Sequence, residues 1–317
     1  MAETISALPS QKEAGNIGVD REHLRSHARG AMLGLALGDA FGATVEFMTP
    51  REIKAQFGCH RMIRGGGWLR LPPGQVTDDT TMAFSLADAW LESAAPPGAE
   101  ECARAFDAWM RAKPIDIGHT VRRGIARFRR TGEALIPPSE DAGNGATMRC
   151  TPVALATLGA PLADIEAATL TQARVTHNNP LTDSATCAVV RMIQAGLDGT
   201  GIRGIMALAH ELSHIHPIFR FRKRHVENPS GYIVDTMHVV LQGIDVNDSF
   251  EGVLLDVVNR GGDADTTGAI AGTVMGALVG ETALPPLWLK ALNPVVAKRC
   301  VDYADFLIQR SPAWQAS

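Results

Sequence analysis

Two stretches of the sequence, VTDDTTM and NRGGDADTTG, each set a pair of aspartates beside threonines just before an apolar segment. One such residue is enough to cap a helix N-terminus, so a pair exceeds what capping needs. Two carboxylates about 4 Å apart repel each other by roughly 4 kcal/mol at an effective dielectric near 20. If the two stretches meet in the fold, only bound cations make the arrangement tenable. The candidate ligands are the four aspartates, Asp78, Asp79, Asp263 and Asp265, together with hydroxyls of the adjacent threonines.

The donor types predict the kind of ion. Carboxylates and hydroxyls are hard oxygen ligands, which suit magnesium or manganese. Zinc sites usually contain histidine or cysteine, and neither occurs in the two stretches. We therefore expect a dinuclear centre with two divalent cations, Mn²⁺ or Mg²⁺.

Two familiar motifs compete for DADTTG. The EF-hand calcium loop would place acids at Asp263 and Asp265 and a glycine at Gly268, but its twelfth position is Val274 instead of glutamate. The haloacid-dehalogenase phosphatases carry DxDxT after a buried strand, whereas NRGG precedes the aspartates here. Neither motif fits.

The segment HELSHIHP satisfies the HExxH pattern of zinc metalloproteases, with His210 and His214 as ligands and Glu211 as base. Asp235 follows at a plausible distance for a third ligand. However, Pro217 ends the segment almost at once. A zinc metalloprotease remains the minor alternative.

Composition narrows the class of protein. The chain has 317 residues, 45% of them hydrophobic, and a formal net charge of -4, so no bulk charge favours nucleic acid. Five isolated cysteines fit a reducing cytoplasm, and no stretch approaches the roughly 20 apolar residues of a membrane span. Residues 1–20 resemble a polar, disordered lead-in, and residues 21–317 are expected to form one domain.

Alanine, leucine and methionine recur at helical spacing, while β-branched alternation is scarce, so we expect an all-α fold. Glycines at every fourth position, in 30–38 and in 268–280, give each of two helices a glycine stripe, a face without side chains. Such faces would let the two backbones pack closely. The expected helices span about 22–38, 79–93, 99–112, 117–131, 146–158, 162–174, 181–198, 202–213, 230–243, 249–259, 266–280 and 294–310.

Five ordered motifs, GAMLGLALGDAFGATVEFM, VTDDTTM, GNGATMR, THNNP and NRGGDADTTGAIAG, resemble those of the ADP-ribosylglycohydrolases. The resemblance covers about residues 25–290. Within the family the chain is most similar to the enzymes that reactivate dinitrogenase reductase in nitrogen-fixing bacteria. The resemblance implies an all-α, single-domain fold with a dinuclear magnesium or manganese centre at the base of an ADP-ribose cleft. It also implies that one half of this metal site is formed by Thr77, Asp78 and Asp79 and the other half by Asp263, Asp265 and Thr266.

The resemblance also implies roles for residues outside the two acidic stretches. Glu46 matches an acidic residue that lies close to the metals in the family, and Asp116 matches an aspartate implicated in catalysis. Asp141 would face the same cleft. From the residues alone, Glu46 could be a surface carboxylate and Asp116 the N-cap of the next helix.

The GNGATMR stretch could hold a pyrophosphate on backbone amides at a helix start, through Gly143, Asn144 and Gly145. A purely structural turn is the alternative. His177 could contact the ribose or cap the helix that begins near Pro180.

The implied substrate is an arginine side chain that carries ADP-ribose on a target protein, by resemblance the nitrogenase iron protein. Cations on the ribose hydroxyls would orient the sugar and activate water, while Asp116 and Glu46 transfer protons.

The resemblance further suggests a PII-type signalling protein and an ammonium transporter as partners, with reversible membrane association of a cytoplasmic protein. A non-catalytic ADP-ribose binder is the alternative, although both aspartate pairs are retained.

Overall fold

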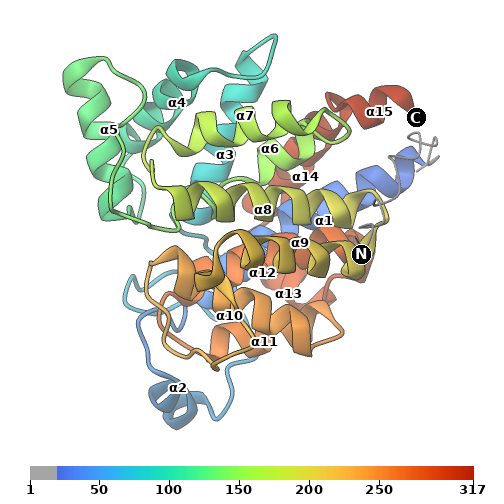
Figure 1. Ribbon diagram of the computed structural model, residues 1–317. Helices are drawn as coiled ribbons and strands as arrows, with labels where there is room; N and C mark the ends of the chain where they lie inside the picture. Colours follow the sequence, from blue (N-terminus) through green and yellow to red (C-terminus); the bar gives the residue numbers. More distant parts are fainter. Residues whose placement is uncertain (1–19) are drawn as a thin grey trace, which may run out of the picture.

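The computed structural model describes residues 20–317, which fold into helices joined by short connections (Figure 1). No strand forms within these residues, where the β-type pairings are two isolated bridges, Gly66 with Leu71 and Gly143 with Tyr232. The all-α expectation is confirmed. The lead-in expected over residues 1–20 lies, apart from Asp20, outside the described residues.

The first half of the fold consists of α1 (Arg21–Gly42), α2 (Pro50–Phe57), α3 (Asp78–Glu92), α4 (Ala99–Arg111), α5 (His119–Thr131), α6 (Thr151–Ala156) and α7 (Leu162–Ala173). The second half consists of α8 (Pro180–Leu197), α9 (Gly201–Ile215), α10 (Ile233–Val246), α11 (Phe250–Asn259), α12 (Ala264–Val279), α13 (Pro286–Ala291), α14 (Pro294–Gln309) and α15 (Pro312–Ala316). Two short 3₁₀ turns lie at Pro217–Phe219 and Glu281–Ala283.

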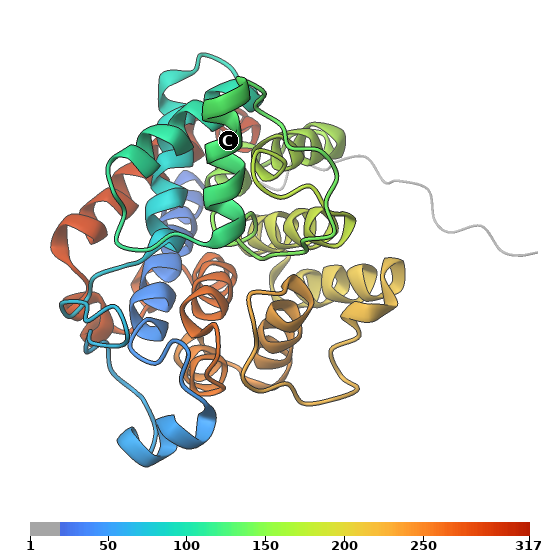
Figure 2. The ribbon, with the colours of Figure 1, turned by 90° about the vertical axis from the view of Figure 1, so that its left-hand side faces the viewer.

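The helices α1 and α12 form the centre of the molecule. Figure 2 shows them side by side, with the blue α1 next to the orange α12, and α12 also packs against α8, α10 and α11. Every residue of α12 from Ala264 to Ala277 is buried. A helix that is apolar on all sides belongs in a protein interior, and here it carries one of the two acidic stretches at its N-terminus.

Glycines bring the two central backbones into direct contact. A Cβ atom added at Gly34 would lie 2.1 Å from the carbonyl oxygen of Gly272, and one at Gly38 would lie 2.0 Å from that of Gly268. Any larger residue must push the helices apart. The close approach expected from the two glycine stripes is therefore confirmed.

We predict that Gly34→Ala destabilises the protein by about 3 kcal/mol or more, because the added methyl group meets rigid backbone on the facing helix. Thermal or urea unfolding measures the loss. Gly118→Ala is the matched control, since no heavy atom lies within 4 Å of a Cβ built at Gly118. Equal stability of the two variants would contradict the prediction.

The structure departs from the expected helices in two ways: one expected helix is shorter, and the short helices α2, α13 and α15 are not among those expected. The helix expected over 146–158 is shorter: residues 145–149 form turns, and α6 begins only at Thr151. The reason is Pro152, which lacks an amide hydrogen and is tolerated only in a first helical turn. Helix α2 is not among the expected helices. Its N-terminus nevertheless carries a recognisable start signal, a capping box formed by Thr49 and Glu52.

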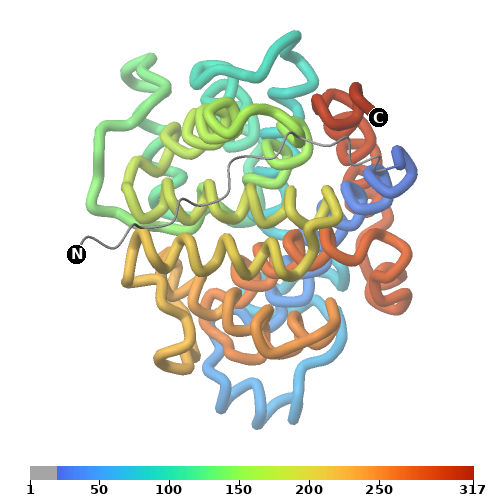
Figure 3. Tube along the Cα trace, turned by 45° about the vertical axis from the view of Figure 1, so that its right-hand side comes forward, coloured from blue at the N-terminus to red at the C-terminus, as the bar shows by residue number. Residues whose placement is uncertain are grey.

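The outer helices complete the scaffold. In Figure 1, α8 and α9 run side by side across the molecule, and α2 projects from its lower edge. Figure 3 shows the red α15 beside the blue start of α1, and there the guanidinium of Arg21 lies 5.3 Å from the ring centroid of Trp314. Among the described helices, none combines the length and apolar character that crossing a membrane requires.

Candidate metal centre

The loop after α1 and the loop before α12 are joined by reciprocal backbone hydrogen bonds. The amide of Phe47 donates to the carbonyl of Gly262 at 2.7 Å, and the amide of Gly262 donates to the carbonyl of Met48 at 2.9 Å. Gly261 and Gly262 have φ values of 70° and 65°, a region that favours glycine. These two glycines therefore make the turn that directs the following aspartates inward.

The two acidic stretches, about 185 residues apart in sequence, meet in the structure. The Oγ1 atom of Thr77 lies 3.1 Å from Oδ2 of Asp79 and 3.4 Å from Oδ2 of Asp265. From the other stretch, Oγ1 of Thr266 donates to Oδ2 of Asp79 at 3.4 Å. Oxygen atoms from α3 and α12 thus surround one small volume.

Helix capping does not account for these side chains. Thr77 is the N-cap residue of α3 and Asp263 is that of α12, yet neither side chain accepts a capping hydrogen bond from its helix. Their oxygen atoms instead contact other side chains of the site, those of Thr77 contacting Asp39 and Asp79 and those of Asp263 contacting Asn144.

Glu46 joins the acids from the loop after α1. Oxygen atoms of Glu46, Asp263 and Asp265 lie within 4.8 Å of one another, and this is the one such group of potential metal ligands within residues 20–317. Glu46 is 5% exposed, so it is not a surface carboxylate. The Nε1 atom of Trp68 donates to its Oε2 at 2.6 Å.

The electrostatics of this cluster demand positive charge. Burial, followed by the charges of neighbouring carboxylates, raises the pKa of Asp79 and Asp265 well above the usual value. Burial and then Asp116 and Asp39 raise the pKa of Asp78 to about 7. The pKa of Glu46 rises to about 8, again mainly through burial.

One buried oxygen atom supports the fit of these residues to a cation. Oδ1 of Asp79 is buried and has no hydrogen-bond partner. A buried carboxylate oxygen without a partner is costly, whereas a divalent cation would both satisfy and neutralise it. The residues present therefore fit a hard metal ion.

Asp39, which the sequence motifs do not single out, positions the first acidic stretch. This fully buried residue of α1 accepts hydrogen bonds from the amide and hydroxyl of Thr77, at 2.9 and 3.0 Å, and from the hydroxyl of Thr80 at 2.6 Å. Burial raises its pKa to about 6, and the hydrogen bonds oppose the rise. The sequence does contain a signal for this role of Asp39, because this aspartate interrupts the otherwise apolar stretch GLALGDAFG.

Asp116 lies beside the cluster, in the loop between α4 and α5. It lines a cavity of about 300 Å³, called here the central cavity, together with Glu46, Asp78, Asp263 and other residues. The N-cap of α5 is Gly118, so Asp116 does not cap that helix. Its charge contributes to the raised pKa of both Asp78 and Glu46.

The GNGATMR stretch lines the central cavity but does not open a helix there. The amide of Asn144 donates to the carbonyl of Gly231 at 3.0 Å, so it is not free to bind a phosphate. Instead, Nδ2 of Asn144 donates to Oδ2 of Asp263 at 2.6 Å and to Oγ1 of Thr236 at 3.0 Å. Asn144 therefore orients Asp263, a role that the sequence did not indicate.

His177 also lines the central cavity, against the two glycines of the same stretch. Cβ atoms built at Gly143 and Gly145 would lie 3.0 and 2.9 Å from its ring. Burial lowers the pKa of His177 to about 3, so the ring is neutral, and its Nδ1 pairs with Oγ1 of Thr176. The side chain of Asn179 caps α8, which excludes the alternative that His177 does so.

Asp141 is the one candidate that the structure places apart from the others. Its side chain is exposed, pairs with Arg123, and lines a separate cavity with Arg127 and Arg130.

The residues of the HExxH pattern do not belong to the acidic cluster. The exposed side chain of Glu211 pairs with Arg191, at 2.7 Å between Oε1 and Nη1. The described residues give the metalloprotease alternative no metal cluster.

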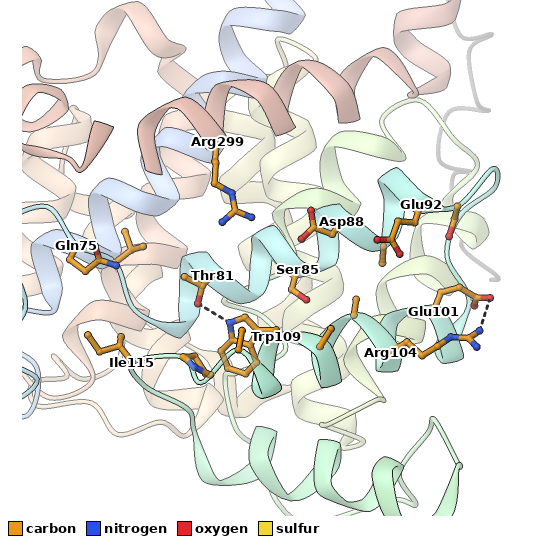
Figure 4. Close-up of a pocket in the computed structure, with 17 residues that line it drawn as sticks. Gln75, Thr81, Ser85, Asp88, Glu92, Glu101, Arg104, Trp109, Ile115 and Arg299 are labelled. Atoms are coloured by element: carbon orange, nitrogen blue, oxygen red, sulfur yellow. Dashed lines mark hydrogen bonds and ion pairs between the residues drawn. The ribbon is translucent and has the colours of Figure 1, made fainter. Parts of the chain in front are cut away.

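A cavity of about 870 Å³, larger than the central cavity, lies outside the acidic centre, between α3, α4 and α14 (Figure 4). Ser85 and Asp88 from α3 face it, as do Arg104 from α4 and Arg299 from α14. Trp109 also lines the cavity and donates from Nε1 to Oγ1 of Thr81 at 3.0 Å. Volume alone therefore does not identify the functional site.

Comparisons with known proteins agree with this geometry. The sequence model of the ADP-ribosylglycohydrolase family matches residues 20–316. The chain is 47% identical over 286 residues to the ADP-ribosyl-[dinitrogen reductase] glycohydrolase of Rhodospirillum rubrum, covering 90% of this chain and 96% of that protein. It is 31% identical to the ADP-ribosylarginine hydrolase Tri1 of Pseudomonas putida, covering 92% and 80%.

A solved structure supports the same assignment. A chain described as an ADP-ribosylglycohydrolase-related protein complex superposes with a TM-score of 0.80 at 32% identity, covering 91% of this chain and 99% of its own. Sequence and fold therefore agree over nearly the whole described length. The protein belongs to the ADP-ribosylglycohydrolase family.

Proposed function

We propose that this protein is a hydrolase that removes ADP-ribose from a modified arginine side chain of a target protein. The observation that carries the proposal is the meeting of two distant acidic stretches, with Glu46, at the base of the central cavity. The 47% and 31% identities to enzymes named for this chemistry support it. The domain that does this is taken to span residues 21–317.

Two divalent cations, Mn²⁺ or Mg²⁺, are part of the proposal. Thr77, Asp78, Asp79, Asp263, Asp265 and Thr266 would hold them. When bound, such cations offset the charge of the carboxylates, bind ribose hydroxyls and make water a better nucleophile. The unpartnered Oδ1 of Asp79 and the raised pKa values support this donor set.

The protein's own residues orient the reacting groups and transfer protons. Cleavage of the bond between the anomeric carbon and the guanidinium nitrogen builds positive charge on the ribose, and the surrounding carboxylates stabilise that charge. Asp116 and Glu46 line the cavity beside the acids, where a carboxyl group can take a proton from the attacking water and return one to the leaving nitrogen. Asn144 holds Asp263 in place, and the glycines of its loop let the loop pack against the ring of His177.

The target and its setting are also proposals. The Rhodospirillum rubrum relative supports dinitrogenase reductase, the nitrogenase iron protein, as the modified protein. A cytoplasmic location, regulation by a PII-type protein and recruitment by an ammonium transporter follow from the same resemblance.

Release of ADP-ribose from an arginine-modified protein tests the proposal. We expect rapid release with Mn²⁺ or Mg²⁺ and loss of release in excess chelator, restored by adding the metal back. Binding of ADP-ribose without any metal-dependent release would identify a non-catalytic binding protein instead.

A further inference from the structure

A second cavity, of about 810 Å³, opens on the other side of Glu46 and is called here the side cavity. It shares Glu46 and Phe47 with the central cavity. Two aromatic side chains stand exposed where the cavities meet, Phe47 at 64% and Trp68 at 51%. Their ring centroids are 5.4 Å apart, and the ring planes are tilted by 48°. An exposed aromatic pair at the mouth of a cavity is typical of a ligand-binding surface.

The backbone holds Phe47 in an unfavourable conformation. Its φ is 63°, in the left-handed region that a residue with a large side chain rarely adopts. The hydrogen bond from its amide to Gly262 fixes this conformation. Strain of this kind gathers at binding and catalytic sites, and here it sets the position of an exposed ring relative to the loop that carries Asp263.

Trp68 is fixed with respect to the same acids. Its Nε1 donates to Oε2 of Glu46 at 2.6 Å. The glycine loop before it lies against the end of α1, where a Cβ at Gly67 would be 2.3 Å from the carbonyl oxygen of Ala43. The ring is therefore held over the junction of the two cavities.

The substrate of the proposed reaction has two parts, one on each side of the bond that breaks. The central cavity runs from the acids past Gly143, Asn144 and His177, and this side suits the sugar and its phosphates. The side cavity adjoins the central cavity at Glu46 and Phe47, so a substrate whose sugar fills the central cavity can extend its leaving group into the side cavity. That group is a guanidinium, a planar cation that stacks on aromatic rings and is attracted by a carboxylate.

On the basis of the proposed hydrolase function, we propose that Phe47 and Trp68 form the subsite that holds the modified arginine of the target protein. The rings stack against the guanidinium and the aliphatic part of the side chain. Glu46 contributes negative charge at the boundary of the two cavities. The subsite thus selects arginine over modified residues that lack a planar cation.

The test uses free ADP-ribosylarginine as substrate, and ADP-ribose as a competing product that lacks the arginine. Phe47→Leu and Trp68→Leu are each expected to raise KM about fivefold, the equivalent of about 1 kcal/mol. For Phe47→Leu, the value of kcat and the inhibition constant of ADP-ribose should change by less than about twofold. Both Trp68 variants also lose the hydrogen bond to Glu46, so their kcat should fall to a similar extent, while the inhibition constant of ADP-ribose should again change by less than about twofold. Trp68→Phe keeps a ring and should restore the KM, and Leu287→Ala, at an equally exposed site on α13, should behave as wild type.

Several results would overturn the inference. An unchanged KM in both leucine variants would exclude an arginine subsite, while the wild-type release would leave the hydrolase function intact. An inhibition constant of ADP-ribose that rises as much as the KM would place the sugar or the adenine on the rings. If Trp68→Phe raises the KM as much as Trp68→Leu does, the hydrogen bond to Glu46 matters and the ring does not. No release by the wild-type protein would refute both the function and the subsite.

Discussion

Asp265→Asn is expected to lower metal-dependent release of ADP-ribose by at least about 100-fold, because loss of even an outer partner of a metal ligand costs about 10- to 100-fold. The substitution keeps the size of the side chain and removes a charge that faces Glu46, Asp79 and Asp263. Kinetics and metal analysis of the purified protein measure both consequences. We expect less than the wild-type metal content.

The same variant should be more stable than the wild type when no metal is present. The neutral amide that replaces the carboxylate no longer repels the buried acids around it, so the midpoint of thermal unfolding in chelator should rise. A rise in stability with a loss of activity separates damage to the site from collapse of the fold. Asp245→Asn is the control, since Asp245 pairs with Arg222 away from the acids. Unchanged metal content and turnover in Asp265→Asn would refute the metal site.

The stability of the metal-free protein is expected to fall as the pH rises from about 5 to 8. The folded protein raises the pKa of Asp39 to about 6, of Asp78 to about 7 and of Glu46 to about 8. A group whose pKa is raised on folding stabilises the fold fully below its unfolded value, near 4, and that contribution is lost as the pH passes its folded value. Deprotonation therefore opposes folding across this window.

Divalent cations should reverse the trend, because they bind the deprotonated carboxylates. Thermal unfolding in chelator and in millimolar Mn²⁺, at pH 5 and pH 8, measures the effect. Each 1 kcal/mol lost from the free energy of unfolding lowers the midpoint by about 2 °C for a large domain. A midpoint in chelator that stays flat or rises between pH 5 and pH 8 would contradict the expected repulsion. The gain from Mn²⁺ should be larger at pH 8.

The two acidic stretches are recognisable from sequence because their chemistry is local. Carboxylates two residues apart, such as Asp263 and Asp265, stand out in any fold. The glycine stripes are readable for a similar reason, since a spacing of four maps onto one helix face. Local patterns thus predict both halves of the site and the helices that bring them together.

The remaining site residues depend on contacts that no local pattern specifies. Asp39 acts on Thr77, 38 residues further along the chain, and Trp68 acts on Glu46 across a loop. In the sequence Asn144 resembles a phosphate ligand, because a glycine turn before an apolar segment is typical of a helix start. In the structure the amide of Asn144 is paired with Gly231 and the helix begins only beside Pro152, so the side chain of Asn144 acts on Asp263 instead. The outward direction of Asp141 is set by its ion pair with Arg123.

The central pairing of α1 with α12 has a consequence for biosynthesis. Gly272 follows its partner Gly34 by about 240 residues, so at roughly 5–20 residues per second the ribosome completes α12 about 10–50 s after α1. During that interval the apolar surface of α1 has no native neighbour on its glycine face. The nascent chain is therefore expected to need shielding by a chaperone, and a truncated product that stops before α12 should be cleared by proteolysis.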